Sequence, residues 1–313
     1  MDKPFPFTAT EDQVAAARAA LYEWVFTHCE GEHQRWLMDQ VNQMALVDQW
    51  SEQPNATRQF DIAFGMIPRR ISKEKLNLSS AQQQKAQQLL TGWQPNLWQV
   101  DEAARILLVS SAGDKTHTPE RVKHLLRHSD ASEQLALYRG LLLYPQGKAI
   151  LDAVGEGLRS NMSVVFEAIA HHNPFPAMQF DEHRFNHMVL KALFIESSLH
   201  PIVGLSDRNN PELTRMLIDY AHERMAAGRT VSWELWQLVT PFANMKMLEP
   251  FKILLEARTI DRDSLLSQKG LALALSDCSD TNTREWIIAN AQYPVNFESN
   301  LSWDSLLLES TGT

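Results

Sequence analysis

The chain has 313 residues, of which 44% are hydrophobic and 21% are charged, and its formal net charge is −9. This composition favours a folded chain over a disordered one, and the acidic balance argues against a nucleic-acid-binding surface. The sequence holds 39 Leu and 31 Ala but only 12 Gly. Because Leu and Ala favour helices and nucleotide-binding loops require Gly, we predict an all-α protein without such a loop.

Capping signals, hydrophobic periodicity and prolines divide the first half of the chain into short helices. Thr10-Glu-Asp-Gln13 fits a capping box, in which two backbone amides at a helix start are satisfied by side chains. The segment 53–79 is the least helical region of the sequence. The predicted helices cover approximately residues 10–29, 32–49, 56–66, 79–90, 96–110, 119–128, 131–143, 148–158 and 163–171.

The second half of the chain shows the same pattern, with frequent prolines between helical segments. Pro250 is expected to shorten or kink its helix. Residues 303–313 are expected to form a loose tail. The predicted helices cover approximately residues 181–197, 211–227, 232–239, 242–257, 263–275 and 283–290.

The spacing of the helices predicts their architecture. No repeat of fixed period occurs, so the consensus repeat families are not supported. About one helix per 15–20 residues is typical of antiparallel helical hairpins. We predict a single domain over residues 1–313, either an irregular HEAT-like stack of helical hairpins or a compact helical domain.

The sequence lacks the common catalytic and cofactor motifs. It contains no phosphate-binding loop, no G-x-S-x-G turn and no C-x-x-C pair. No segment is apolar enough to span a membrane, and no secretory signal is visible. Cys29 and Cys278 do not form a disulfide framework. We therefore expect a cytoplasmic protein without membrane insertion and without a cofactor.

His183 and His187 are candidate metal ligands, because two histidines four residues apart on a helix face the same way. The zinc-protease pattern requires Glu directly after the first His, and Arg184 occupies that place. A third ligand could come from His222 or Glu223. A structural or surface role is favoured over a metal site.

Lys191 lies in the apolar run Met188–Ile195, where an unpaired buried ammonium would be costly. It continues the stripe of His183 and His187, so it belongs either to an exposed polar face or to a ligand pocket. The helix over 211–227 carries a second polar face. That face is either a solvated set of ion pairs or a surface that binds a ligand or partner; its residues are Glu212, Arg215, Asp219, His222 and Glu223.

Several aromatic and sulfur-containing side chains are candidates for the wall of a pocket. The simplest interpretation places them in the core. Alternatively, they enclose an aromatic or prenyl-like molecule. These residues are Phe175, Phe180, Trp233, Trp236, Met245 and Met247.

One stretch of the chain, about residues 140–242, resembles the EboA family. The matching pieces are the Asn173–Pro176 turn, Asn186 with the following MVLKALF at 188–194, DRNNPEL at 207–213 and DYAHER at 219–224. Each piece alone is weak, whereas their joint occurrence in this order is fairly specific. The stretch covers about a third of the chain.

The resemblance implies a role in metabolite trafficking without an established reaction. EboA proteins are encoded beside a membrane prenyltransferase-like enzyme in bacterial and algal gene clusters linked to moving a precursor from cytoplasm to periplasm. The resemblance therefore implies the products of such a cluster as partners. It assigns no catalytic residue. The candidate ligand- or partner-binding positions are Asn186, Lys191, Arg208, Asn210, Glu212, Tyr220, His222, Glu223 and Arg224.

Three functions remain open from the sequence. The first is a non-catalytic protein that binds a hydrophobic precursor, or the enzymes that process it, with Lys191, Arg208 and residues 219–224 around one cavity. The second is a HEAT-like adaptor that binds only proteins. The third is an enzyme with a His-based metal site.

Overall fold

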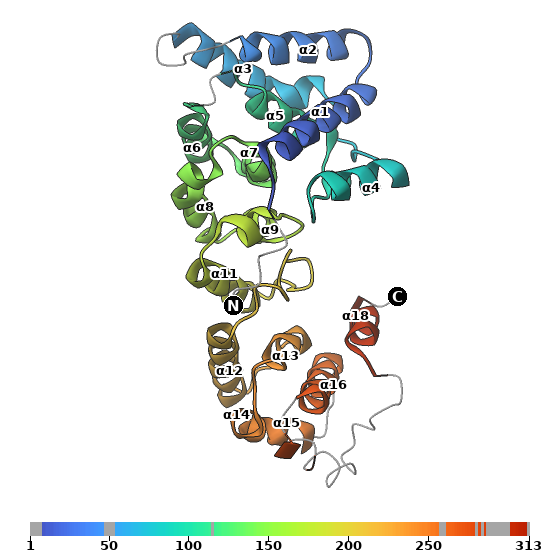
Figure 1. Ribbon diagram of the computed structural model, residues 1–313. Coiled ribbons are helices and arrows are strands. Elements are labelled where there is room, and N and C mark those ends of the chain that lie inside the picture. Colours follow the sequence, from blue (N-terminus) through green and yellow to red (C-terminus); the bar gives the residue numbers. More distant parts are fainter. Residues whose placement is uncertain are drawn as a thin grey trace. The chain divides into compact units, whose positions relative to one another are not determined.

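The computed structural model describes residues 8–46, 54–113, 116–256, 261–278, 281–282, 285 and 301–311. In these residues the secondary structure consists of helices and turns, with no strand (Figure 1). Two isolated β-bridges join Lys75 to Gln99 and His171 to Ile202. The predicted all-α fold is confirmed.

The chain divides into two compact units, and the prediction of a single domain stays a prediction. The first unit comprises Met1–Asp181 with Pro201–Gly204, and the second comprises Glu182–His200 with Leu205–Thr313. The described helices of the first unit are α1 (Glu11–Thr27), α2 (Gly31–Ala45), α3 (Pro54–Arg70), α4 (Ser80–Leu89), α5 (Val100–Ser110), α6 (Thr118–His128), α7 (Ala131–Arg139), α8 (Leu151–Leu158), α9 (Ser163–Ala170) and α10 (Phe175–Gln179).

Helix α5 forms the centre of the first unit. All eleven of its residues are buried, and it packs against α1, α2, α3 and α7 (Figure 1). Three of the buried residues are charged: Asp101, Glu102 and Arg105. Buried charges need partners. Arg105 forms an ion pair with Asp101, and Arg139 from α7 forms one with Glu102.

Helix α3 is longer than the helix predicted over residues 56–66. It begins at Pro54 and continues through Pro68 to Arg70. Phe60, Phe64 and Ile67 are almost completely buried on one side of this helix. Burial of these three side chains outweighs the cost of a proline near the end of the helix.

Helix α7 is shorter than predicted, because the chain changes direction at Gly140. The helix ends at Arg139, and a 3-10 turn follows over Leu141–Leu143. A Cβ atom at position 140 would lie 2.4 Å from the Tyr144 hydroxyl. Only glycine permits Tyr144 to fold back over the helix end in this way.

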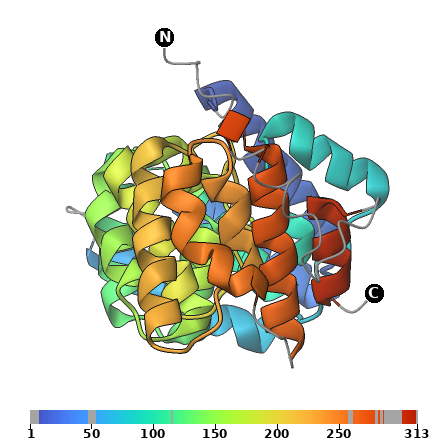
Figure 2. The ribbon, with the colours of Figure 1, turned by 90° about the horizontal axis from the view of Figure 1, so that it is seen from below.

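In the second unit, the helices pack against one another both as chain neighbours and across longer separations. Helix α12 packs on α11 and α13, and α13 packs on α16; Figure 2 shows α12, α13 and α16 side by side. Pro250 interrupts its helix as predicted. The described helices are α11 (Glu182–Phe194), α12 (Pro211–Ala226), α13 (Trp233–Val239), α14 (Met245–Leu248), α15 (Lys252–Glu256), α16 (Arg262–Asp277) and α18 (Trp303–Thr311).

The C-terminal segment differs from the loose tail expected over residues 303–313. Residues 303–311 form α18, which packs on α16 (Figure 2). The side chain of Leu306 is completely buried in a cluster with Trp233, Leu266 and Leu273. Burial of this apolar side chain explains why the segment is ordered as a helix. The helix predicted over 283–290 lies outside the described residues, apart from Glu285.

Candidate functional site

The side chains of Asn186 and Asn210 form two reciprocal hydrogen bonds. The Asn186 amide nitrogen donates to the Asn210 side-chain oxygen at 3.2 Å, and the Asn210 amide nitrogen donates back at 3.0 Å. Asn210 also caps α12, since its side-chain oxygen accepts from the Leu213 backbone nitrogen. The two side chains therefore join the α11 and α12 helices and start α12.

Arg208 and Glu212 lie near the same helix start but make separate contacts. The Arg208 guanidinium stacks over the Phe185 ring, 4.9 Å from its centroid, as a cation–π contact. Glu212 forms an exposed ion-pair series with Arg215 and Asp219 along α12. This series matches the solvated polar face that the sequence offered as one interpretation.

The DYAHER segment at 219–224 spreads its side chains in several directions. The Tyr220 hydroxyl donates to the Leu193 carbonyl oxygen at 3.0 Å and is buried. The exposed His222 ring lies 4.4 Å from the Phe251 ring, and Glu223 is exposed. Arg224 donates to the Thr230 carbonyl oxygen and pairs with Glu196.

The polar stripe on α11 is exposed at one end and half-buried at the other. The exposed rings of His183 and His187 lie 4.2 Å apart. Lys191 is half-buried, and burial lowers the pKa of its ammonium group. Among the described residues, no group of three or more His, Cys, Asp or Glu side chains could hold a metal ion. None of the nine candidate ligand- or partner-binding positions, and neither His183 nor His187, lines the histidine pocket or the α1–α10 cavity described below.

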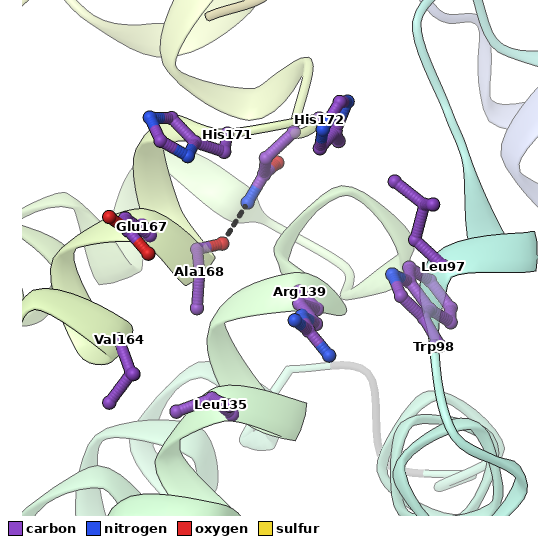
Figure 3. Close-up of a pocket in the computed structure, with 10 residues that line it drawn as sticks. Leu97, Trp98, Leu135, Arg139, Val164, Glu167, Ala168, His171 and His172 are labelled. Atoms are coloured by element: carbon purple, nitrogen blue, oxygen red, sulfur yellow. Dashed lines mark hydrogen bonds between the residues drawn. The ribbon is translucent and has the colours of Figure 1, made fainter. Parts of the chain in front are cut away.

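The first unit contains a small pocket between α7, α9 and the segment that precedes α5, which we call the histidine pocket. Its volume is about 180 Å³. Figure 3 shows Arg139 between Trp98 and Leu97 on one side and Glu167 and Val164 on the other. The remaining lining residues are Leu135, Ala168, His171, His172 and Asn173.

Arg139 carries the positive charge of this pocket. Its Nη1 donates to the Glu102 carboxylate at 2.5 Å, and Glu102 is 7% exposed at its side chain. A guanidinium has five N–H donors. Within the described residues Arg139 bonds only to Glu102, so the other donors are available to a molecule in the pocket.

Asn173 fixes the turn that closes the pocket. Its amide nitrogen donates to the Tyr138 carbonyl oxygen at 2.9 Å and to the Ala168 carbonyl oxygen at 3.1 Å. Its side-chain oxygen accepts from the Phe175 backbone nitrogen. The Asn173–Pro176 motif therefore ties the turn to both α7 and α9.

The two histidines at this turn present their rings to the pocket from different backbone conformations. His171 ends α9, and its backbone nitrogen donates to the Glu167 carbonyl oxygen. His172 has φ = 50°, a left-handed conformation that costs a non-glycine residue free energy and clusters at ligand sites. Its backbone nitrogen donates to the Pro201 carbonyl oxygen. The two rings lie 6.5 Å apart, edge to face.

Sequence reasoning missed the four ionisable residues of the histidine pocket. Glu167, His171 and His172 lie together at the end of α9, whereas Arg139 comes from α7, so the sequence does not show that these side chains meet. The available signal was the pair of consecutive histidines directly before the Asn173–Pro176 motif. Of the proposed pocket-wall aromatics, Phe175 lines the second cavity, whereas Trp236 is fully buried in the second unit.

The fold and the pocket define an all-helical protein whose first unit contains a small pocket lined by both polar and apolar side chains. Within the described residues, no helix is both long and apolar enough to cross a membrane. The chain belongs to the family of the metabolite traffic protein EboA, whose model matches residues 17–240. Family membership suggests a role in metabolite trafficking. No curated protein and no solved structure matches the chain significantly.

Proposed function

We propose that this chain is a non-catalytic binding protein of a metabolite-trafficking system, and that it holds the polar end of a small amphipathic precursor in the histidine pocket. The family match supports the trafficking role, and the matched residues 17–240 include every residue that lines this pocket. We place the ligand in the histidine pocket, rather than on the polar faces of α11 and α12 that the sequence singled out.

The observation that carries the proposal is the arrangement of polar groups in the histidine pocket. Arg139 offers hydrogen-bond donors beyond the one bound to Glu102. The Glu167 carboxylate and the His171 and His172 rings also line the pocket. Converging polar groups in a concave site are typical of a ligand-binding pocket. A group with carbonyl or carboxylate oxygens suits Arg139.

The rim supports an apolar part of the ligand. Leu97 and Val164 line the pocket and are 40% and 49% exposed. A volume of about 180 Å³ is below the usual range for a complete drug-sized ligand. The polar end of the ligand would occupy the pocket, and its hydrophobic part would cover these two side chains.

The proposed partners follow from the family resemblance alone. The chain would act in the cytoplasm beside the products of its own gene cluster, and would pass its ligand to a membrane prenyltransferase-like enzyme. The hydrophobic part of the ligand would then be protected from water before transfer.

Native mass spectrometry of the purified chain tests the proposal. We expect a small molecule to co-purify with the wild type and to be lost in Val164→Glu, because a charge on the rim opposes the apolar part of the ligand. Ile62→Glu on α3 is the matched control, since Ile62 is 55% exposed and lies outside the pocket. Arg139→Lys retains a charge beside Glu102 but removes the forked donors, so it should also lose the ligand. Equal occupancy in all four proteins would contradict the proposal.

A further inference from the structure

The first unit contains a second and larger cavity, which we call the α1–α10 cavity. It lies between the first half of α1, the segment 141–147 and α10, and its volume is about 590 Å³. This volume falls in the range of small-molecule binding sites. The histidine pocket and this cavity share no lining residue.

The wall of the α1–α10 cavity combines apolar and polar side chains in about equal measure. Val14 of α1, Leu141, Leu142, Phe175 and Met178 all line it. Leu141, Leu142 and Phe175 are buried, and the Phe175 backbone nitrogen is held by Asn173. An apolar molecule in this cavity would cover hydrophobic side chains from three segments.

Arg18 provides a fixed cation in this wall. Its Nε donates to the Leu143 carbonyl oxygen at 2.7 Å, which holds the guanidinium against the segment 141–147. Burial lowers the pKa of Arg18, and Glu11 opposes this effect; an arginine nonetheless stays charged in a protein. The two terminal nitrogens of Arg18 make no hydrogen bond to a described residue, so they are available to a carboxylate.

Gln179 provides a second polar group in this wall, and its side-chain oxygen has no hydrogen-bond partner among the described residues. This oxygen atom is buried. Buried polar groups in proteins are normally satisfied, so this atom points to a missing donor. A hydroxyl group suits either orientation of the amide, because a hydroxyl both donates and accepts.

We propose that the α1–α10 cavity binds a hydroxy acid with an apolar body, whose carboxylate pairs with Arg18 and whose hydroxyl group bonds to Gln179. Glu11 and Asp12 are exposed residues that line the same cavity. Their negative charges disfavour a polyanion such as a diphosphate, so the ligand carries a single charge. The proposal does not depend on the ligand of the histidine pocket.

Calorimetric titration of the full chain with 10-hydroxydecanoate and with decanoate tests the role of Gln179. Gln179→Met keeps the side-chain length and removes the amide. We expect it to weaken binding of 10-hydroxydecanoate about tenfold and to leave binding of decanoate unchanged. It should also raise the thermal unfolding midpoint of the ligand-free chain, because the unsatisfied buried oxygen is gone. An equal loss for both probes, or no loss for either, would overturn the role of Gln179.

A matched pair of variants on α1 tests the location. Ala15 and Ala16 are both exposed, but only Ala15 lines the cavity. Ala15→Phe should fill the cavity and abolish saturable binding of both probes, whereas Ala16→Phe should bind them as the wild type does. Unchanged binding in Ala15→Phe, or no saturable binding of either probe by the wild type, would overturn the proposal.

Discussion

At the scale of single residues, two neighbours at the end of α9 have opposite effects on stability. Asn173 makes three hydrogen bonds with its buried amide group and so stabilises the turn. His172 lies in a left-handed conformation that an L-residue other than glycine adopts at a cost. The hydrogen bonds of Asn173 and the β-bridge between His171 and Ile202 flank His172 and hold it in its left-handed conformation.

Substitution of His172 separates backbone strain from ring contacts. His172→Ala and His172→Gly both remove the imidazole, but only glycine adopts φ = 50° without a steric cost. We expect His172→Gly to be more stable than His172→Ala by about 1 kcal/mol, as measured by chemical denaturation. Equal stabilities would show that the left-handed conformation does not persist in solution.

Removal of the Asn173 side chain should destabilise the first unit. Asn173→Ala leaves the Tyr138 and Ala168 carbonyl oxygens without their buried donor, and we expect a loss of about 2–4 kcal/mol. Asn77→Ala provides a control at an exposed position and should change stability by less than about 0.5 kcal/mol. A loss in Asn173→Ala no larger than in the control would rule out the proposed tie between α7 and α9.

The candidate site was only partly predictable, because a sequence reveals spacing along one helix but not the meeting of separate segments. The Asn173–Pro176 motif was found, yet Arg139 and Glu167 were not singled out, since they lie on two different helices, α7 and α9. Conversely, the dense polar stripe of α12 was visible in the sequence. Its Glu212 and Asp219 carboxylates pair with Arg215 at the surface, and such exposed pairs are typical of a solvated helix face.

At the scale of helices, tertiary burial decided the cases in which local signals failed. The helix predicted over 56–66 continues through Pro68 to Arg70 in α3, and Ile67, beyond the predicted end, is completely buried. The segment over 303–313 had no strong helix signal, and α18 is held by contacts to α16. The packing of α3 on α5 and of α18 on α16 joins residues that are far apart in the chain, so the local sequence does not reveal it.

Two leucines of α18 provide a matched test of its packing. Leu306 is completely buried, whereas Leu308 is 58% exposed. Leu306→Ala should cost about 2–5 kcal/mol by leaving a cavity against Trp233 and Leu273, and Leu308→Ala should cost less than about 0.5 kcal/mol. Hydrogen exchange of the α16 amides should become faster in Leu306→Ala only. Similar exchange in the two variants would mean that α18 does not stabilise α16.

At the scale of the whole molecule, composition predicted the fold class well. A Leu- and Ala-rich, Gly-poor chain favours helices everywhere, and most predicted helices match described ones to within a few residues. Composition could not predict where cavities lie, because a cavity depends on the gaps left between packed helices. The histidine pocket and the α1–α10 cavity therefore became visible only in the structure.

Buried tyrosines in both units predict a loss of stability at high pH. Burial raises the pKa of Tyr138 to about 12 and also raises the pKa values of Tyr144 and Tyr220. A pKa that is higher in the folded state makes the folded state bind the proton more tightly. The stabilisation is therefore complete below about pH 10, the unfolded value, and is lost as the pH rises through the folded value.

The alkaline unfolding of wild type and Tyr138→Phe can be compared directly. Between about pH 10 and 12 we expect the wild type to lose more unfolding free energy than the variant, because Phe has no proton to release. The difference between the two proteins at pH 8 serves as the reference for the lost packing and hydrogen bonding of the hydroxyl. Parallel curves from pH 8 to pH 12 would contradict the raised pKa of Tyr138.

The left-handed conformation at His172 also limits which amino acids can occupy this position during evolution. Asparagine, aspartate, histidine and glycine tolerate such a conformation, whereas β-branched residues do not. In other members of the EboA family, a valine, isoleucine or threonine aligned with His172 would therefore indicate a differently folded turn. Variation at this single column would separate relatives that share the histidine pocket from those that have lost it.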